Sequence, residues 1–225
     1  MAEDENEKKE EKMVSFSGEV GAFTSYYNKD TGERVSKEAL LAPVFTLTHN
    51  ATEAYISIYG YFTKDSSELD VSFGKLFHFG KYEFDLGVSY YNPESLTEIK
   101  GDFVAAYVGV KGPKVWGFVP AVYIEAVSPL DRDLGGSGVL YKISFQDDDF
   151  MEIYGQSFGL LLEGGGNNGV YGSDPIPVSF LRGTISTKIN VFSQEVRLEG
   201  SLQDCLGGIA RAAGIEPYIG LRMVF

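Results

Sequence analysis

Short segments in which apolar and polar residues alternate with a period of two constrain this chain more than any other feature. Successive side chains of a β-strand point to opposite faces, so such a segment predicts a strand with one apolar and one polar face. The clearest example is Tyr82–Tyr91, in which Leu86 lies on the apolar face and Asp85 on the polar face. Twelve segments of this kind follow one another: Val14–Tyr27, Leu41–His49, Ala54–Thr63, Leu69–Phe79, Tyr82–Tyr91, Phe103–Lys111, Phe118–Val127, Val139–Gln146, Phe150–Glu163, Phe180–Phe192, Glu195–Leu202 and Tyr218–Phe225. The alternation slips within Phe150–Glu163, which predicts a bulge around Gly155–Gly159. The chain is therefore predicted to be all-β.

The composition agrees with this prediction and narrows the function. The chain has 225 residues, enough for one domain or at most two, and 27 glycines with 14% aromatic residues suit many short strands. No run approaches 18 consecutive apolar residues, so no transmembrane helix is predicted, although barrel strands of about 9–11 residues would escape that search. The net charge of −13 argues against nucleic acid as a partner. The single cysteine, Cys205, leaves no internal disulfide to form.

Long and short connections between the segments alternate almost throughout. Long connections such as residues 28–40 and 164–177 are followed by short ones such as 50–53 and 193–194. Membrane barrels have short periplasmic turns and longer extracellular loops, whereas a soluble sandwich has no physical reason to sort its loops in this way. The sequence therefore predicts a transmembrane antiparallel up-and-down β-barrel of about twelve strands. A soluble sandwich or lipocalin-like barrel, with the apolar faces as its core, remains the alternative fold.

The polar face of the predicted strands carries many charges, which in a membrane barrel would line the lumen. Their outward apolar partners would form an exposed patch far larger than soluble monomers carry. These predicted lumen residues are Glu19, Asp70, Glu83, Asp85, Glu125, Lys142, Glu152, Arg182, Lys188, Arg197, Glu199 and Arg222, with Glu195 on the same face. A lumen of this composition indicates a small porin or channel for small polar or ionic solutes.

Aromatic residues gather near the two ends of the predicted strands, as interface girdles of a membrane barrel do. The short-turn end is predicted to carry Phe16, Phe79, Tyr82, Trp116, Phe118, Phe145, Phe150, Phe192 and Phe225. The long-loop end is predicted to carry Tyr26, Tyr27, Tyr61, Tyr90 and Tyr91.

Residues 1–12, MAEDENEKKEEK, are almost all charged and lack the apolar stretch of a signal peptide. They predict a solvated, disordered tail ahead of a barrel of residues 13–225, and we expect a secretion signal to have been removed before Met1. With an even number of strands, both ends of the barrel are expected on the periplasmic side.

Two parts of the sequence resemble known membrane barrels. The segment IGLRMVF at Ile219–Phe225 resembles the sorting signal of bacterial outer-membrane proteins, with Leu221, Met223 and Phe225 in its alternating positions. Glu68–Gly74 and Tyr82–Pro93 are similar to the TorF family of small porins, although the Arg-Gly motif expected after that family's first strand is absent. The resemblance implies a location in the bacterial outer membrane, insertion by the barrel assembly machinery and the lipid bilayer as a partner.

No motif predicts an enzyme, a cofactor or a metal centre. Only His49 and His78 are present, and both fall toward the short-turn end rather than among the outer loops, where membrane hydrolase chemistry would need them. Asp147–Asp149 offers oxygen ligands for Ca²⁺ but is predicted to be a solvated tight turn. Gly164–Gly169 lacks the Gly-Lys-Ser/Thr ending of a phosphate-binding loop. Two functional alternatives to a channel remain: a non-conducting barrel that acts through its outer loops, and a soluble ligand-binding barrel.

Overall fold

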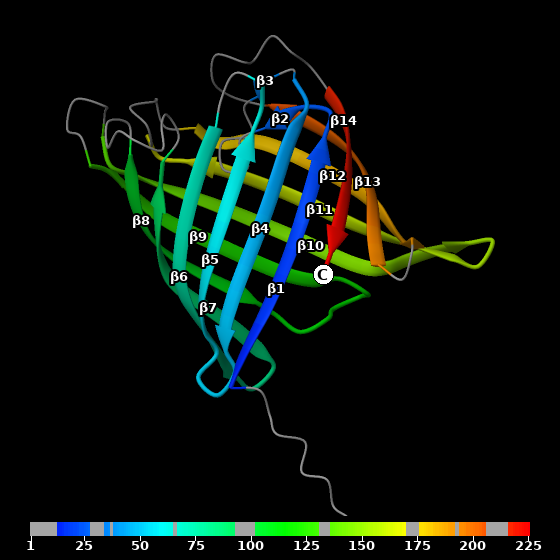
Figure 1. Cartoon of the computed structure of the whole chain (residues 1–225), viewed down its shortest axis with the longest axis horizontal. Helices are drawn as coiled ribbons and strands as arrows, with labels where there is room; N and C mark the ends of the chain where they lie inside the picture. The colour runs from blue at the N-terminus through cyan, green and yellow to red at the C-terminus, as the bar shows by residue number, and fades with distance from the viewer. Residues whose placement is uncertain are drawn as a thin grey trace, which may run out of the picture.

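The strands predicted from the sequence form a closed, antiparallel barrel of twelve strands (Figure 1). The computed structural model describes residues 13–27, 34–36, 38–64, 67–92, 102–130, 136–169, 176–191, 194–205 and 216–225; the predicted tail of residues 1–12 lies outside these ranges. The barrel strands are β1 (Val14–Phe23), β4 (Leu40–His49), β5 (Ala54–Phe62), β6 (Ser67–Phe79), β7 (Tyr82–Tyr91), β8 (Phe103–Lys111), β9 (Val119–Pro129), β10 (Gly138–Ile153), β11 (Gln156–Asn167), β12 (Ile176–Val191), β13 (Gln194–Cys205) and β14 (Glu216–Val224). A separate two-stranded sheet joins β2 (Tyr26–Tyr27) and β3 (Arg34–Ser36). Within the described residues, no helix is long and apolar enough to cross a membrane.

The barrel closes between its first and last strands. β1 pairs with β4 along its whole length but meets β14 over Glu19–Phe23 only. At the next position toward the short-turn end, the backbones of Gly18 and Phe225 exchange two N–H···O=C hydrogen bonds of 2.9 Å. The Phe225 ring points outward and packs beside Phe45, with 6.2 Å between ring centroids. Gly18 leaves room for that ring, because a Cβ atom there would lie 2.6 Å from Cε2 of Phe225. Phe225 is thus the outward-facing end of the closing strand.

The barrel wall carries apolar side chains on its outside and polar side chains on its inside, the reverse of the arrangement in a soluble protein. Large apolar side chains such as Val88, Phe73 and Ile58 are exposed on the outside. The buried polar side chains, among them Asp70, Glu125 and Gln203, face the inside. A soluble sandwich or lipocalin-like barrel would bury the apolar faces, so that alternative is wrong. Leu86, on the outside, and Asp85, on the inside, lie on the predicted faces.

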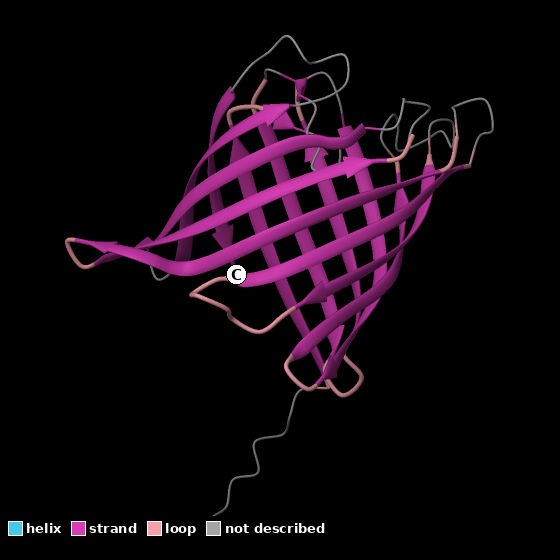
Figure 2. Cartoon of the chain, turned by 180° about the vertical axis from the view of Figure 1, so that it is seen from behind, coloured by secondary structure: helices cyan, strands magenta, loops and turns pink. Residues whose placement is uncertain are grey.

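The connections sort to the two ends as the sequence predicted. The strand ends joined by short turns, such as residues 80–81 and 154–155, lie at one end, and the strand ends that flank the longer connections lie at the other (Figures 1 and 2). The turn at Tyr154–Gly155 has two consecutive positive φ values, 51° and 77°, which is the backbone of a type I′ hairpin turn.

The boundary between β10 and β11 corrects one sequence prediction. Asp147–Asp149 is not a tight turn: it lies within β10, where the pairing with β11 shifts register between Asp147 and Met151. The irregular pairing therefore lies at Asp147–Met151 and not at Gly155–Gly159, where the sequence predicted a bulge. The chain reverses at Tyr154–Gly155. The carboxylates are held in place locally, since Lys114 Nζ lies 3.1 Å from Asp147 Oδ1 and Ser157 donates a hydrogen bond to Asp149. The β10–β11 hairpin extends beyond the neighbouring turns and is seen at the right of Figure 1.

The aromatic residues agree with the girdle prediction at the short-turn end and only in part at the long-loop end, where Tyr90 faces outward opposite Val104. At the short-turn end Phe16, Phe79 and Tyr82 are exposed on the outside, and Trp116 is 97% exposed on its turn. The side chain of Phe192 lies outside the described residues. At the long-loop end, Tyr61 lines an interior cavity and Tyr91 donates a hydrogen bond to Glu125 inside the barrel. These two tyrosines are interior residues because they share the inward parity of Ser57 and Ser89 on their strands. The side chains of Tyr26 and Tyr27 are not described.

Candidate functional site

The interior of the barrel holds twelve of the thirteen charged residues that the sequence placed on a polar face. They alternate along their strands with exposed apolar residues and are distributed as follows: Glu19 on β1, Asp70 on β6, Glu83 and Asp85 on β7, Glu125 on β9, Lys142 on β10, Arg182 and Lys188 on β12, Glu195, Arg197 and Glu199 on β13, and Arg222 on β14. Glu152 differs. It pairs with Ser157 on the projecting β10–β11 hairpin, beyond the register shift, and is exposed there.

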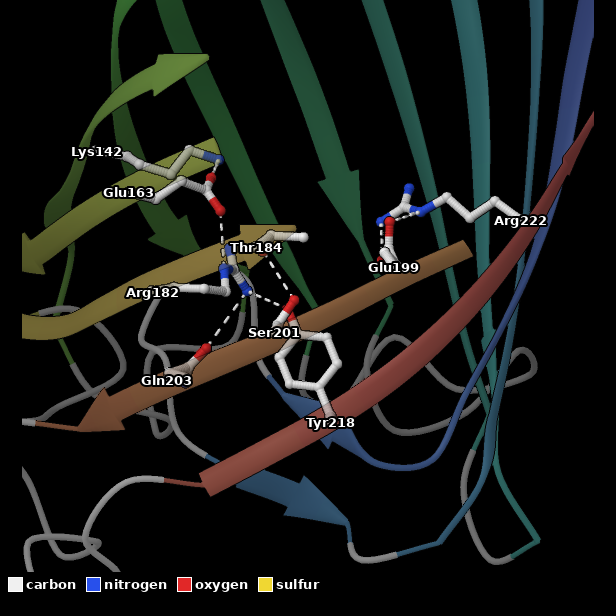
Figure 3. A network of polar contacts seen from close by, with 9 residues as sticks. All are labelled: Lys142, Glu163, Arg182, Thr184, Glu199, Ser201, Gln203, Tyr218 and Arg222. Carbon is white, nitrogen blue, oxygen red and sulfur yellow. Dashed lines mark hydrogen bonds and ion pairs between the residues drawn. The ribbon is translucent and has the colours of Figure 1, made fainter. Parts of the chain in front are cut away.

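One cluster of charges on β10–β14 centres on Glu163 and Arg182 (Figure 3). Arg182 Nε lies 2.8 Å from one carboxylate oxygen of Glu163, and Lys142 Nζ lies 3.7 Å from the other. Arg182 also donates weaker hydrogen bonds, both 3.4 Å long, to Gln203 and Tyr218. A buried guanidinium needs several hydrogen-bond acceptors to offset its desolvation. Here β11, β13 and β14 supply them, through Glu163, Gln203 and Tyr218. Sequence reasoning missed Glu163 because the alternating phase of Phe150–Glu163 was broken by a misplaced bulge.

A second cluster lies on the wall formed by β13, β14 and β1. Arg222 Nη1 lies 2.7 Å from Glu19 Oε1, and Arg222 Nε lies 3.1 Å from Glu199 Oε2. The pairing register places Gly21 and Arg197 directly opposite Arg222 on its two sides. Both carboxylates come from strands adjacent to β14, so this network runs along the wall and does not cross the lumen.

An interior cavity of about 390 Å³ is lined by both clusters. Charged side chains of Arg182, Arg222 and Glu163 share it with the aromatic rings of Phe23 and Tyr59. Smaller apolar residues, including Leu40, Val44 and Leu161, complete the lining. Such a surface combines fixed charges with apolar contacts and suits small solutes that carry both kinds of group.

The opposite wall carries a flat cluster of tyrosines around Asp85. Tyr55 Oη donates to the Asp85 carboxylate, whose oxygens lie 2.8 and 2.9 Å away, and lies 2.7 Å from Tyr107 Oη. Because the single Tyr55 proton faces Asp85, Tyr107 donates in the second contact. The cluster spans β5 to β8 and rests on the paired glycines Gly74 and Gly87. Sequence alternation marked Tyr55 and Tyr107 only as strand residues and gave no signal that they would meet.

The close fit of Tyr107 on Gly87 gives a testable prediction. A Cβ atom at Gly87 would lie 2.3 Å from Tyr107 Oη and 2.4 Å from the backbone oxygen of Phe73, so it cannot be relieved by moving the tyrosine alone. We expect Gly87→Ala to lower the free energy of unfolding by about 1–3 kcal/mol, measured by urea unfolding in detergent micelles. Gly109→Ala is the matched control, because its closest contact is an ordinary 3.4 Å. Equal stability of the two variants would contradict the packing described.

Three carboxylates are buried toward the long-loop end of β6–β9. Asp70, Asp102 and Glu125 are each at most 1% exposed. Tyr90 donates a hydrogen bond to Asp102 and Tyr91 donates one to Glu125, while the Asn92 backbone N–H lies 3.4 Å from Asp70 Oδ1. Within the part of the chain that the structure describes, no group of three or more His, Cys, Asp or Glu residues is arranged to hold a metal ion.

Comparisons with known proteins found similar barrels among solved structures only. No protein-family model matches the sequence, and no curated protein matches it. OpdO of Pseudomonas aeruginosa is 11% identical with a TM-score of 0.44, and OprD of the same organism is 10% identical with a TM-score of 0.44. A BenF-like porin from Pseudomonas fluorescens is 10% identical with a TM-score of 0.42. Each match covers 96% of this chain but only 65–66% of the other, so the chain spans just under two thirds of their length. The barrel assignment rests on the strand pairing described above.

Proposed function

We propose that this barrel spans a bacterial outer membrane and passes small polar or ionic solutes through its charged lumen. The observation that carries the proposal is the inversion of the wall, with apolar side chains such as Val88 exposed outside and charged side chains such as Arg222 inside. In water that exterior would be an apolar patch far above what soluble monomers carry. In a bilayer it contacts hydrocarbon, and the closed strand pairing leaves few backbone groups unsatisfied.

The arrangement of the interior side chains favours passage over a plugged lumen. The ion pairs of Arg182 with Glu163 and of Arg222 with Glu19 and Glu199 join neighbouring strands. Long side chains on the opposite wall lie flat over Gly74 and Gly87 rather than reaching inward. Charges held along the wall in this way do not cross the lumen, and they present a polar surface to solutes.

Several finer features belong to the same proposal. The short turns would face the periplasm and the longer loops the exterior, with residues 1–12 forming a periplasmic tail ahead of the barrel domain. The resemblance of two segments to the TorF porins, and of Leu221, Met223 and Phe225 to the outer-membrane sorting signal, supports insertion by the barrel assembly machinery. The proposed passage involves no catalytic step and no cofactor.

The test compares two neighbouring positions on β10 in planar bilayers. Ser144 lines an interior pocket beside Asp85, whereas Phe145 is exposed on the outside. In a Cys205→Ala background, we expect a bulky charged thiol reagent to lower the conductance of Ser144→Cys by about twofold and to leave that of Phe145→Cys unchanged. A folded, inserted barrel with no conductance would overturn the channel and favour a role for the outer loops. Equal block at both positions would overturn the assignment of this face to the lumen.

A further inference from the structure

The charges inside the barrel are divided unequally between its two halves. On β5–β9 the described inward-facing strand residues include five carboxylates and one lysine: Glu68, Asp70, Glu83, Asp85, Glu125 and Lys111. On β10–β14 and β1 they include five cations and four carboxylates: Lys142, Arg182, Lys188, Arg197, Arg222, Glu19, Glu163, Glu195 and Glu199. Each half is a run of adjacent strands in the ring. One wall of the lumen is therefore acidic and the facing wall carries nearly all of the cations.

Two residues on these walls retain charges that are not neutralised by an ion pair. Among the described residues, Asp85 accepts hydrogen bonds from Tyr55 but has no cation within 4 Å. Within the described part of the chain, Arg197 makes no hydrogen bond and no ion pair. Its two register neighbours, Lys188 and Arg222, are also cations, and both are already paired. Asp85 and Arg197 are thus a free anion and a free cation on the interior surface.

Their positions place them opposite each other. Asp85 is on β7 and Arg197 is on β13, and these strands are six apart in the closed ring of twelve. Both strands leave the short-turn end, and each residue is the third after the first residue of its strand, Tyr82 or Gln194. Strands that start at one rim and share a tilt carry such positions at a similar depth. A free negative charge and a free positive charge therefore face each other across the lumen near the short-turn end.

We propose that this opposed pair orients solutes with separated charges, so that the channel favours small zwitterions, with an ammonium or guanidinium group at one end and a carboxylate or phosphate at the other. This inference rests on the proposed channel function and names its solute class. A fixed field across the lumen turns a dipolar solute so that its positive end faces β7 and its negative end faces β13. A neutral solute of the same size gains nothing from that field, and a singly charged ion is attracted to one wall and repelled by the other.

The experiment separates net charge from charge separation. The double variant Asp85→Asn with Arg197→Gln removes one charge of each sign, so the net charge of the lumen is unchanged. We expect its reversal potential in a potassium chloride gradient to match that of the parent protein. In reconstituted vesicles, we expect the rate of glycylglycine entry relative to an uncharged solute of the same size to fall by about threefold. The single variants are expected to shift the reversal potential in opposite directions, Asp85→Asn toward anions and Arg197→Gln toward cations.

The matched control removes a paired set of charges from the same half-barrel. Lys188→Gln with Glu195→Gln deletes an ion pair of 3.1 Å, also without a change in net charge, and should leave the relative rate of glycylglycine entry unchanged. If the Asp85 and Arg197 double variant keeps the parent ratio while both proteins admit the uncharged solute, the inference is overturned and the channel stands. If the parent protein is folded in the vesicles and admits neither solute, the channel function itself falls, and the inference with it.

Discussion

Val88→Arg is expected to destabilise the membrane-inserted barrel by about 2–4 kcal/mol, the cost of an arginine on the lipid face near the bilayer midplane. Val88 is 54% exposed on the outside of β7, and its register neighbours, Phe73 and Ala106, are apolar and also face outward. An arginine at this position would have no polar residue directly opposite it on either neighbouring strand and would lie far from both headgroup layers. The measurement is the free energy of unfolding in phospholipid vesicles, from urea titration of tryptophan fluorescence and of heat-dependent gel mobility.

The control places the same charge at the edge of the apolar belt. Phe79 is exposed at the short-turn end of β6, where arginine is expected to cost about 0–1 kcal/mol because it can reach the headgroups. The difference between Val88→Arg and Phe79→Arg is therefore the informative quantity. If both variants unfold at the parent's urea concentration in vesicles, Val88 does not contact hydrocarbon, and the proposed membrane location is contradicted.

The register explains why Leu86, two residues away on the same face, is a poorer probe. Leu86 lies directly opposite Lys75, an outward-facing lysine whose Nζ is 4.8 Å from the centroid of the Phe77 ring. A cation is thus already present beside Leu86, and an arginine there would share whatever water or headgroup contact Lys75 uses. The alternating pattern showed that Leu86 faces outward, but its neighbour across the strand pair became known only from the pairing.

The sequence was sufficient for the barrel and its faces because both follow from local rules. A period of two fixes which residues share a face, and the alternation of long and short connections fixes which strand ends lie together. These rules placed Asp85, Arg197 and Arg222 inside and Leu221 and Met223 outside without knowledge of any contact. They apply wherever the alternation is unbroken.

The sequence was insufficient where the phase breaks or where distant strands meet. The pairing is irregular at Asp147–Met151, where the sequence predicted a turn. For this reason the sequence did not show that Glu163 faces inward, and it placed Glu152 in the lumen although this residue lies on the projecting hairpin. The contact between Tyr55 and Tyr107 depends on two glycines on the intervening strands, which no local pattern reveals. An aromatic residue at a strand end also suits either face, and for this reason Tyr61 and Tyr91 were assigned to a girdle although they point inward.

Removal of the Phe225 ring is expected to weaken both the closing seam and the delivery of the protein to the membrane. The ring packs on Phe45 and covers Gly18, at the point where the pairing between β1 and β14 ends toward the short-turn rim. The Phe225 side chain is about half exposed, so Phe225→Ala should lower the free energy of unfolding by about 2 kcal/mol, less than the 3–5 kcal/mol of a fully buried phenylalanine. In cells the amount of folded barrel should fall by about tenfold, because lost stability and a weakened sorting signal act together.

Phe45→Ala separates packing from sorting. Phe45 contributes the other side of the same ring contact and also stacks on Phe16, with 6.0 Å between centroids, but it lies outside the segment that resembles the sorting signal. The two variants should therefore lose similar stability when the purified chains are refolded into vesicles. In cells, Phe225→Ala should accumulate to a clearly lower level than Phe45→Ala, measured by membrane fractionation and heat-dependent gel mobility. Equal levels of the two variants would mean that Phe225 acts through the seam alone, since packing is the one property that both substitutions remove.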